Sequence, residues 1–164
     1  MLGRLMLIGM WVAVAGVLAL GFDSWLDRQQ NPNRELQTVV ASDGAREVSL
    51  ERNRNGHYIA EGTINGHTVK FMLDTGASDI SIPEAVAKEI GLERGQPMQY
   101  RTANGMITAF TTQLDLVTLG GLEQQDIRGS INPYMDGDHI LLGMSFLGDL
   151  DFRQSGGVLT LTQY

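Results

Sequence analysis

The chain has 164 residues, 43% of them hydrophobic and 19% charged, so it can bury one core but not two sizeable ones. Its 12 Lys and Arg against 19 Asp and Glu give a net charge of -7, which argues against nucleic acid as a partner because that partner requires a basic face. The chain contains no cysteine, which excludes disulfides, thiolate catalysis and cysteine metal sites.

The first feature along the chain is an uncharged stretch over residues 5–22. Its 18 residues would form a helix roughly 27 Å long, which matches the hydrocarbon thickness of a bilayer. We therefore expect a transmembrane signal anchor here, preceded by a cytoplasmic N-terminus over residues 1–4. Arg4 before the stretch favours a cytoplasmic N-terminus and an exported remainder. A signal peptide cut after Gly21 is the alternative, and the minimal basic region favours the retained anchor.

Residues 23–45 are polar and show no sustained period, which predicts a linker between the anchor and a folded domain over residues 46–164. The domain begins with a strand-like alternation over residues 48–52. Two further strands, residues 57–64 and 67–73, flank Asn65-Gly66, a two-residue hairpin signal.

The second of these strands ends in a loop with the sequence Asp74-Thr75-Gly76-Ala77-Ser78. A carboxylate that directly follows apolar residues needs compensating hydrogen-bond donors. The hydroxyls of Thr75 and Ser78 and the backbone N–H groups exposed by the turn at Gly76 can supply them. Read by itself, Asp-Thr-Gly is also an ordinary turn.

After this loop, residues 80–82 continue as a strand, and a capping box formed by Ser81 and Glu84 predicts a short helix that ends at Ile90. A hairpin follows, with strands over residues 99–102 and 106–112 around Asn104-Gly105. More strand-like segments lead to residues 140–142, an apolar strand that ends at Gly143 and precedes a short apolar helix. Residues 150–153 and 158–162 form a last predicted hairpin.

The two motifs together resemble the aspartic proteases. Asp74 to Ser78 matches the active-site loop of that family, and Leu141-Leu142-Gly143 matches its hydrophobic-hydrophobic-glycine element. The resemblance, which covers roughly residues 46–164, is closest to bacterial membrane-anchored retropepsin-like aspartic proteases. It implies an all-β fold with one or two short helices, arranged as the single-lobe closed barrel of an acid protease.

By this resemblance Asp74 is the catalytic residue, and Gly76 lies beside the substrate backbone. Thr75 braces the active-site loops of two protomers against each other. The hairpin around Asn104, Gly105 and Met106 corresponds to the flap that closes over a peptide substrate. Nothing in the residues Asn104-Gly105 themselves separates a flap from an ordinary surface hairpin.

Hydrolysis by carboxylates needs two of them, one ionised and one protonated, and the chain has one Asp-Thr-Gly. We therefore predict a homodimer with one Asp74 from each protomer facing the twofold axis. Such a pair shares one proton, so we expect activity at acidic to mildly acidic pH. The C-terminal strand over residues 158–162 is a candidate contributor to the dimer sheet.

The chain departs from the viral pattern at two positions. Ser78 and Met144 stand where viral enzymes usually carry an acid and an arginine, so their charge pair is not expected here. Ser145 is not a serine-nucleophile elbow, because its closing glycine comes one residue too late. Asp79 is more plausibly a loop or cap residue, or a local hydrogen-bond acceptor, than a second catalytic acid.

The function that we expect is an aspartic endopeptidase without metal or other cofactor. The three histidines lack close metal-ligand spacing. The expected location is the bacterial inner membrane, with a single span and the protease domain in the periplasm. A noncatalytic peptide-binding or assembly module that retains the fold is the alternative, and a structural membrane-tethered dimer is a third possibility.

Overall fold

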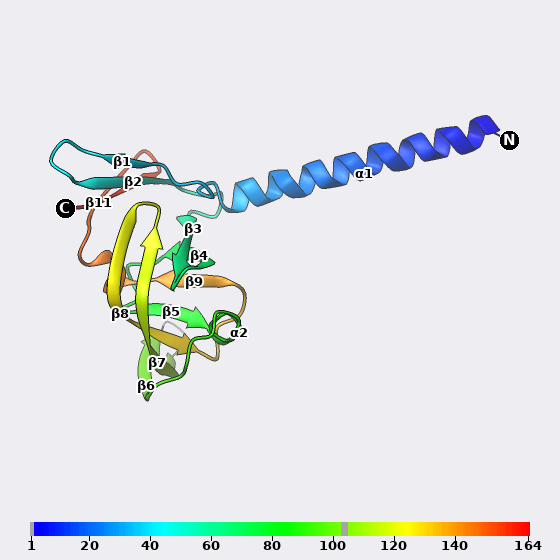
Figure 1. The fold of residues 1–164 in the computed structure, drawn as a ribbon. Helices are drawn as coiled ribbons and strands as arrows, with labels where there is room; N and C mark the ends of the chain where they lie inside the picture. Colours follow the sequence, from blue (N-terminus) through cyan, green and yellow to red (C-terminus); the bar gives the residue numbers. More distant parts are fainter. Residues whose placement is uncertain (1, 103–104) are drawn as a thin grey trace.

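The computed structural model describes residues 2–102 and 105–164 (Figure 1). A long N-terminal helix precedes a β domain that also carries two short helices. In chain order the elements are α1 (Leu2–Gln30), β1 (Thr38–Val40), β2 (Arg46–Glu51), β3 (Ile59–Ile64), β4 (His67–Leu73), β5 (Ile80–Pro83), α2 (Glu84–Glu89), β6 (Pro97–Thr102), β7 (Gly105–Leu119), β8 (Leu122–Asn132), β9 (His139–Leu142), α3 (Met144–Leu147), β10 (Asp151–Ser155) and β11 (Val158–Gln163).

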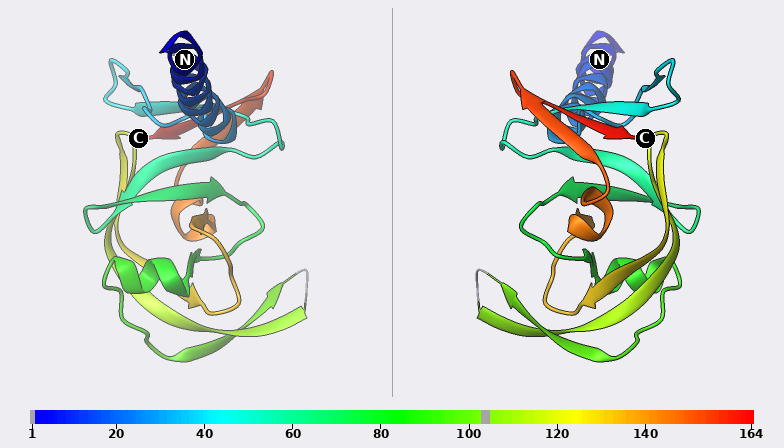
Figure 2. Two further views of the ribbon diagram at one scale, coloured as in Figure 1. Left: turned by 90° about the vertical axis from the view of Figure 1, so that its right-hand side faces the viewer. Right: turned by 90° about the vertical axis from the view of Figure 1, so that its left-hand side faces the viewer.

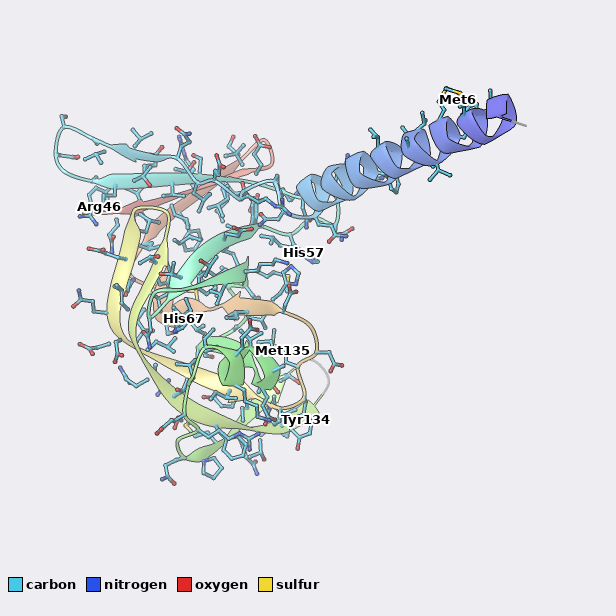
Figure 3. All side chains as sticks on the ribbon, turned by 45° about the vertical axis from the view of Figure 1, so that its right-hand side comes forward. Met6, Arg46, His57, His67, Tyr134 and Met135 are labelled. Atoms are coloured by element: carbon cyan, nitrogen blue, oxygen red, sulfur yellow. The ribbon has the colours of Figure 1, made fainter. Side chains whose placement is uncertain are left out.

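Helix α1 extends away from the β domain as a single rod (Figure 1). Its apolar side chains include Met6 and Trp11, which are 72% and 62% exposed, and Met6 lies near the far end of the rod (Figure 3). Over the described residues, no helix is identified as long and apolar enough to cross a membrane. The expected span over residues 5–22 is therefore not confirmed.

The larger sheet has seven strands in the order β3-β4-β9-β5-β8-β7-β6. Strand β9 lies between β4, to which it is parallel, and β5, to which it is antiparallel. Strand β3 also pairs with β7 through Thr63 and Ile64, which join it to a second neighbour in the same sheet. The structure therefore shows a mostly β domain whose seven-stranded sheet has one additional pairing, between β3 and β7, and the closed barrel that we expected stays a prediction.

A smaller, four-stranded sheet has the order β1-β2-β11-β10, with every neighbouring pair antiparallel. It lies on the side of the domain next to α1, whereas the β6–β7 hairpin curves along the opposite side (Figures 1 and 2). Strand β1 falls within the stretch predicted to be a linker. The same stretch also contains the end of α1, up to Gln30, and the buried residues Asn31 and Asn33, so it is not the unstructured linker that we predicted.

The core is formed by inward-facing residues of the strands and the two short helices. The largest side chains with almost no exposed surface include Phe71 of β4, Leu114 of β7 and Phe146 of α3. Alternation along the strands places these residues on one face and leaves the polar ones outside. The predicted Asn65-Gly66 hairpin is confirmed, with φ angles of 50° and 83° at these two residues.

The predicted short helix is also present, but its capping is different from the expected one. Helix α2 begins after Pro83, and no side chain caps its first turn. Ser81 belongs to β5, where its hydroxyl faces the sulfur of Met135 at 3.9 Å. The capping box of Ser81 and Glu84 is therefore wrong, because the strand continues to the residue before the helix.

Asn33 connects the segment after α1 to the β domain. Its side-chain amide donates to the backbone oxygens of Glu51 at 2.9 Å and Ile59 at 2.7 Å, and its Oδ1 accepts from the Glu51 N–H at 2.6 Å. The residue is 5% exposed. The buried Asn33 amide thus links the end of β2 to the start of β3, two strands that belong to different sheets.

Replacing Asn33 with Ala removes the three bonds and leaves backbone groups of Glu51 and Ile59 without this partner. We expect a loss of about 2–4 kcal/mol in the free energy of unfolding, measured by urea denaturation of the full-length protein. Asn55→Ala, on an exposed turn, is the matched control and should stay close to wild type. A loss for Asn33→Ala no larger than that of the control would contradict this role.

Candidate active site

The active-site loop, residues 74–79, connects the end of β4 to the start of β5. Because β9 lies between these two strands, the loop passes over the C-terminal end of β9. Leu73 pairs with Leu142, and Ser81 pairs with Leu141 on the other side. The topology therefore brings the two sequence motifs, Asp74 to Ser78 and Leu141 to Gly143, into direct contact.

Asp74 is half-buried at the start of the loop. Its Oδ1 accepts a hydrogen bond from the Gly76 N–H at 2.8 Å, and its own N–H donates to the Leu142 oxygen at 3.1 Å. A Cβ on residue 76 would lie 3.1 Å from the same Oδ1, so glycine allows this close approach. The carboxylate is thus held by a backbone donor and still reaches solvent.

The expected hydroxyl donors lie differently. Thr75 and Ser78 are exposed, and the contact made by Ser78 with the neighbouring motif is through its backbone oxygen, which accepts from the Ser145 N–H at 2.9 Å. Ala77 is half-buried, and its oxygen accepts from the Met144 N–H at 2.8 Å. The residues after Asp74 therefore fix the loop through their backbone.

Gly143 packs directly against the loop. A Cβ at this position would collide with the backbone oxygen of Asp79 and would lie 2.6 Å from that of Ala77. Two residues later, the Oγ of Ser145 accepts a hydrogen bond from the N–H of Ile80, the first residue of β5, at 3.1 Å. Ser145 therefore has a structural contact, in agreement with its exclusion as a nucleophile.

A cavity of about 430 Å³ opens beside Asp74. Its walls come from the active-site loop, the β6–β7 hairpin and strands β5, β8 and β9. The lining residues are Asp74, Gly76, Ala77, Ser78, Asp79, Ser81, Tyr100, Arg101, Thr102, Ile107, Ala109, Ser130, Asn132 and Leu141. The cavity is large enough to take side chains of a peptide.

The β6–β7 hairpin forms one wall of the cavity, but through other residues than those predicted. Asn104 lies outside the described residues. Gly105 and Met106 are exposed, and neither is among the described residues that line the cavity. The hairpin instead contributes Tyr100 and Ile107, together with their neighbours.

The sequence did not reveal one polar cluster in the same wall. Asp79 is 4% exposed, and its carboxylate bonds to Tyr100 of β6 and Arg128 of β8. Burial and then the hydrogen bond to Asp79 raise the pKa of Tyr100. The same carboxylate raises the pKa of the Arg128 guanidinium. These three residues are far apart in sequence, and no local pattern connects them.

The histidines lie apart from this site. His57 precedes β3 and His67 begins β4 (Figure 3), while His139 has its Nδ1 3.1 Å from Asp138. Within residues 2–102 and 105–164, no group of three or more His, Asp or Glu is placed to hold a metal ion.

Gly143→Ala tests the close packing of the two motifs. The added methyl group has to displace backbone, so we expect a loss of about 1–3 kcal/mol in unfolding free energy. Gly16→Ala is the control, because a Cβ at Gly16 meets no atom within 4 Å. Chemical denaturation of both full-length variants measures the difference, and equal stability of the two would refute the packing argument.

Comparison with known proteins supports this geometry. Residues 60–149 match the protein family described as "gag-polyprotein putative aspartyl protease". A crystal structure of a retropepsin-like aspartic protease from Rickettsia conorii superimposes with a TM-score of 0.62 and 33% sequence identity, over 79% of this chain and 96% of that one.

Two curated relatives are uncharacterised proteins. One, encoded in the cobV 5′ region of Sinorhizobium, is 32% identical over 71% of this chain, and the other, from Rickettsia prowazekii, is 29% identical over 85%. The aligned parts make up 51% and 63% of the relatives' own lengths. The match of the family over more than half of the chain, on a site with the geometry described above, shows that the chain belongs to the gag-polyprotein aspartyl protease family and has a retropepsin-like fold.

Proposed function

We propose that this protein is an aspartic endopeptidase that acts as a homodimer, with one Asp74 contributed by each protomer. The observation that carries the proposal is the setting of Asp74. Its carboxylate is half-buried, held at Oδ1 by the Gly76 N–H, and borders a cavity that the β6–β7 hairpin helps to enclose. A buried structural acid would instead have all its oxygens paired.

Two such carboxylates at a twofold axis supply the chemistry of peptide hydrolysis. The ionised Asp74 takes a proton from water while the water oxygen attacks the scissile carbonyl carbon, and the protonated Asp74 hydrogen-bonds to the carbonyl oxygen. Collapse of the tetrahedral intermediate breaks the C–N bond, and the Asp74 that took the proton from water gives it to the leaving nitrogen. Because two carboxylates that are close together cannot both ionise easily, they titrate as a pair that shares one proton.

The substrate in this proposal is an extended peptide. It lies between the active-site loop and the β6–β7 hairpin, and its backbone pairs with them as an added strand. The cavity beside Asp74 takes side chains of this peptide. The exposed hydroxyl of Thr75 then contacts the loop of the other protomer.

The smaller sheet suggests which strand joins the protomers. Strand β11, the sequence-based candidate, has β2 on one side and β10 on the other, so both of its edges are already paired within the chain. In the order of this sheet β1 and β10 are the outer strands. All five residues of β10 are exposed, and β10 follows α3, whose first residues bond to the active-site loop. We therefore assign the pairing to β10, because a free strand edge favours pairing with another chain.

The cellular location is a separate part of the proposal and rests on the sequence alone. The uncharged residues 5–22 suggest attachment to the bacterial inner membrane, with the β domain in the periplasm. Confinement to a membrane would raise the effective concentration of protomers for pairing.

Asp74→Asn tests the chemistry. The substitution keeps the size of the side chain and its contact with the Gly76 N–H but removes the titrating group, so we expect peptide cleavage to fall by at least about 100-fold. The assay incubates the purified full-length protein with a mixed peptide library between pH 3 and pH 7. A folded, dimeric Asp74→Asn variant that cleaves as wild type does would refute the proposal. A wild-type protein that binds peptides without cleaving them would favour the noncatalytic peptide-binding module.

Mixing wild-type and Asp74→Asn chains tests whether the site is shared between protomers. When equal amounts exchange freely, random pairing leaves about half of the wild-type chains in mixed dimers that have one aspartate. Activity should then fall to about half, although the amount of wild-type chain is unchanged. Asp126→Asn, an exposed change on β8, is the control and should leave the activity unaltered. Undiminished activity on mixing with Asp74→Asn, in a sample shown to contain mixed dimers, would mean that each chain acts alone.

A further inference from the structure

The carboxylate of Asp79 joins three segments that are distant in sequence. Its Oδ1 accepts hydrogen bonds from Arg128, from Nη2 at 2.9 Å and Nε at 3.3 Å. Its Oδ2 accepts from the Tyr100 hydroxyl at 2.8 Å. The contact therefore connects the end of the active-site loop to β8 and to β6, the outer strand of the hairpin.

Because the Asp79 carboxylate is buried, it needs hydrogen-bond donors from the protein. The Asp79 side chain is 4% exposed, whereas that of Arg128 is 60% exposed and remains in contact with water. A buried carboxylate that loses a partner carries an uncompensated cost, so both donors are held in place once the loop has folded. Burial and the nearby carboxylate raise the pKa of Tyr100, which keeps its hydroxyl protonated and able to donate.

Strand β6 is an outer strand that pairs along its whole length with β7. It is the last strand of the larger sheet. Five of its six residues are exposed, and Tyr100 is the half-buried exception. The Tyr100 side chain thus reaches from the outer strand of the hairpin to the loop that carries Asp74.

We propose that Asp79 and Tyr100 are positioning residues: their hydrogen bond holds β6 against the active-site loop, and Arg128 keeps the Asp79 carboxylate turned toward Tyr100. The hairpin wall of the cavity is then in place before a peptide arrives. Less of the hairpin then has to become ordered when a peptide binds. The contact therefore strengthens peptide binding more than it accelerates the chemical step. The kinetic part of this inference rests on the proposed endopeptidase function, whereas the structural part does not.

Tyr100→Phe removes the hydroxyl and keeps the ring. By hydrogen exchange with mass spectrometry on the full-length protein, we expect the amides of residues 98–102 and 105–110 to exchange about tenfold faster, with β4 unchanged. With a cleaved peptide, KM should rise about tenfold while kcat stays within twofold. Tyr134→Phe, on an exposed loop, is the matched control and should alter neither quantity.

Arg128→Gln is the second variant. It should give the same faster exchange in residues 98–102, and Arg128→Lys should restore part of the protection because it keeps a positive charge beside Asp79. Arg54→Gln, an exposed arginine in the turn between β2 and β3, controls for the loss of a surface charge. Exchange that increases equally in β4 and β6 would show a general loss of stability and overturn the inference.

The two readouts separate this inference from the proposed function. If the protein cleaves no peptide but Tyr100→Phe loosens β6 alone, the positioning contact is supported and the enzymatic proposal is wrong. If the protein cleaves peptides through Asp74 but Tyr100→Phe changes neither β6 exchange nor KM, the enzymatic proposal is supported and the positioning contact is wrong.

Discussion

Gly143 passes so close to the active-site loop that a side chain would not fit between them, because a Cβ would meet the backbone oxygens of Asp79 and Ala77. This close passage is possible because β9 lies between β4 and β5, the two strands that the loop connects. The backbone bonds from Met144 and Ser145 then fix the loop from outside. The orientation of Asp74 is consequently set by packing and backbone geometry, which is the kind of preorganisation that a catalytic carboxylate requires.

Two carboxylates in the same loop show opposite environments. Asp79 is buried, and both of its oxygens accept hydrogen bonds from protein donors. Asp74 is half-buried, takes a backbone N–H at Oδ1, and faces the cavity. The first arrangement is that of a structural acid, and the second leaves room for water and substrate. This contrast supports the proposal that Asp74 carries the chemistry and that Asp79 has a supporting role.

The parts of the fold that sequence could predict are those encoded locally. The Asn65-Gly66 hairpin follows from backbone preferences of two residues, and the loop at Asp74 follows from an apolar strand that ends in turn-forming residues. Contacts between distant segments carry no such local signal: Asp79 reads as a turn residue until Tyr100 and Arg128 are placed beside it. Asn33 was misread for the same reason, because a polar residue in a polar stretch suggests a linker, while its partners lie at Glu51 and Ile59. The edges of the smaller sheet likewise depend on strand order, which periodicity does not determine.

In the enzyme that we propose, two chains build one catalytic site around a pair of Asp74 residues. Calorimetric titration of the full-length protein with a peptide that carries a hydroxyl group in place of the scissile bond measures this directly, since such a compound imitates the tetrahedral intermediate. The account predicts one bound molecule for every two chains, with proton uptake or release on binding and no tight binding to Asp74→Asn. Binding of one molecule to each chain, with equal affinity for Asp74→Asn, would contradict it.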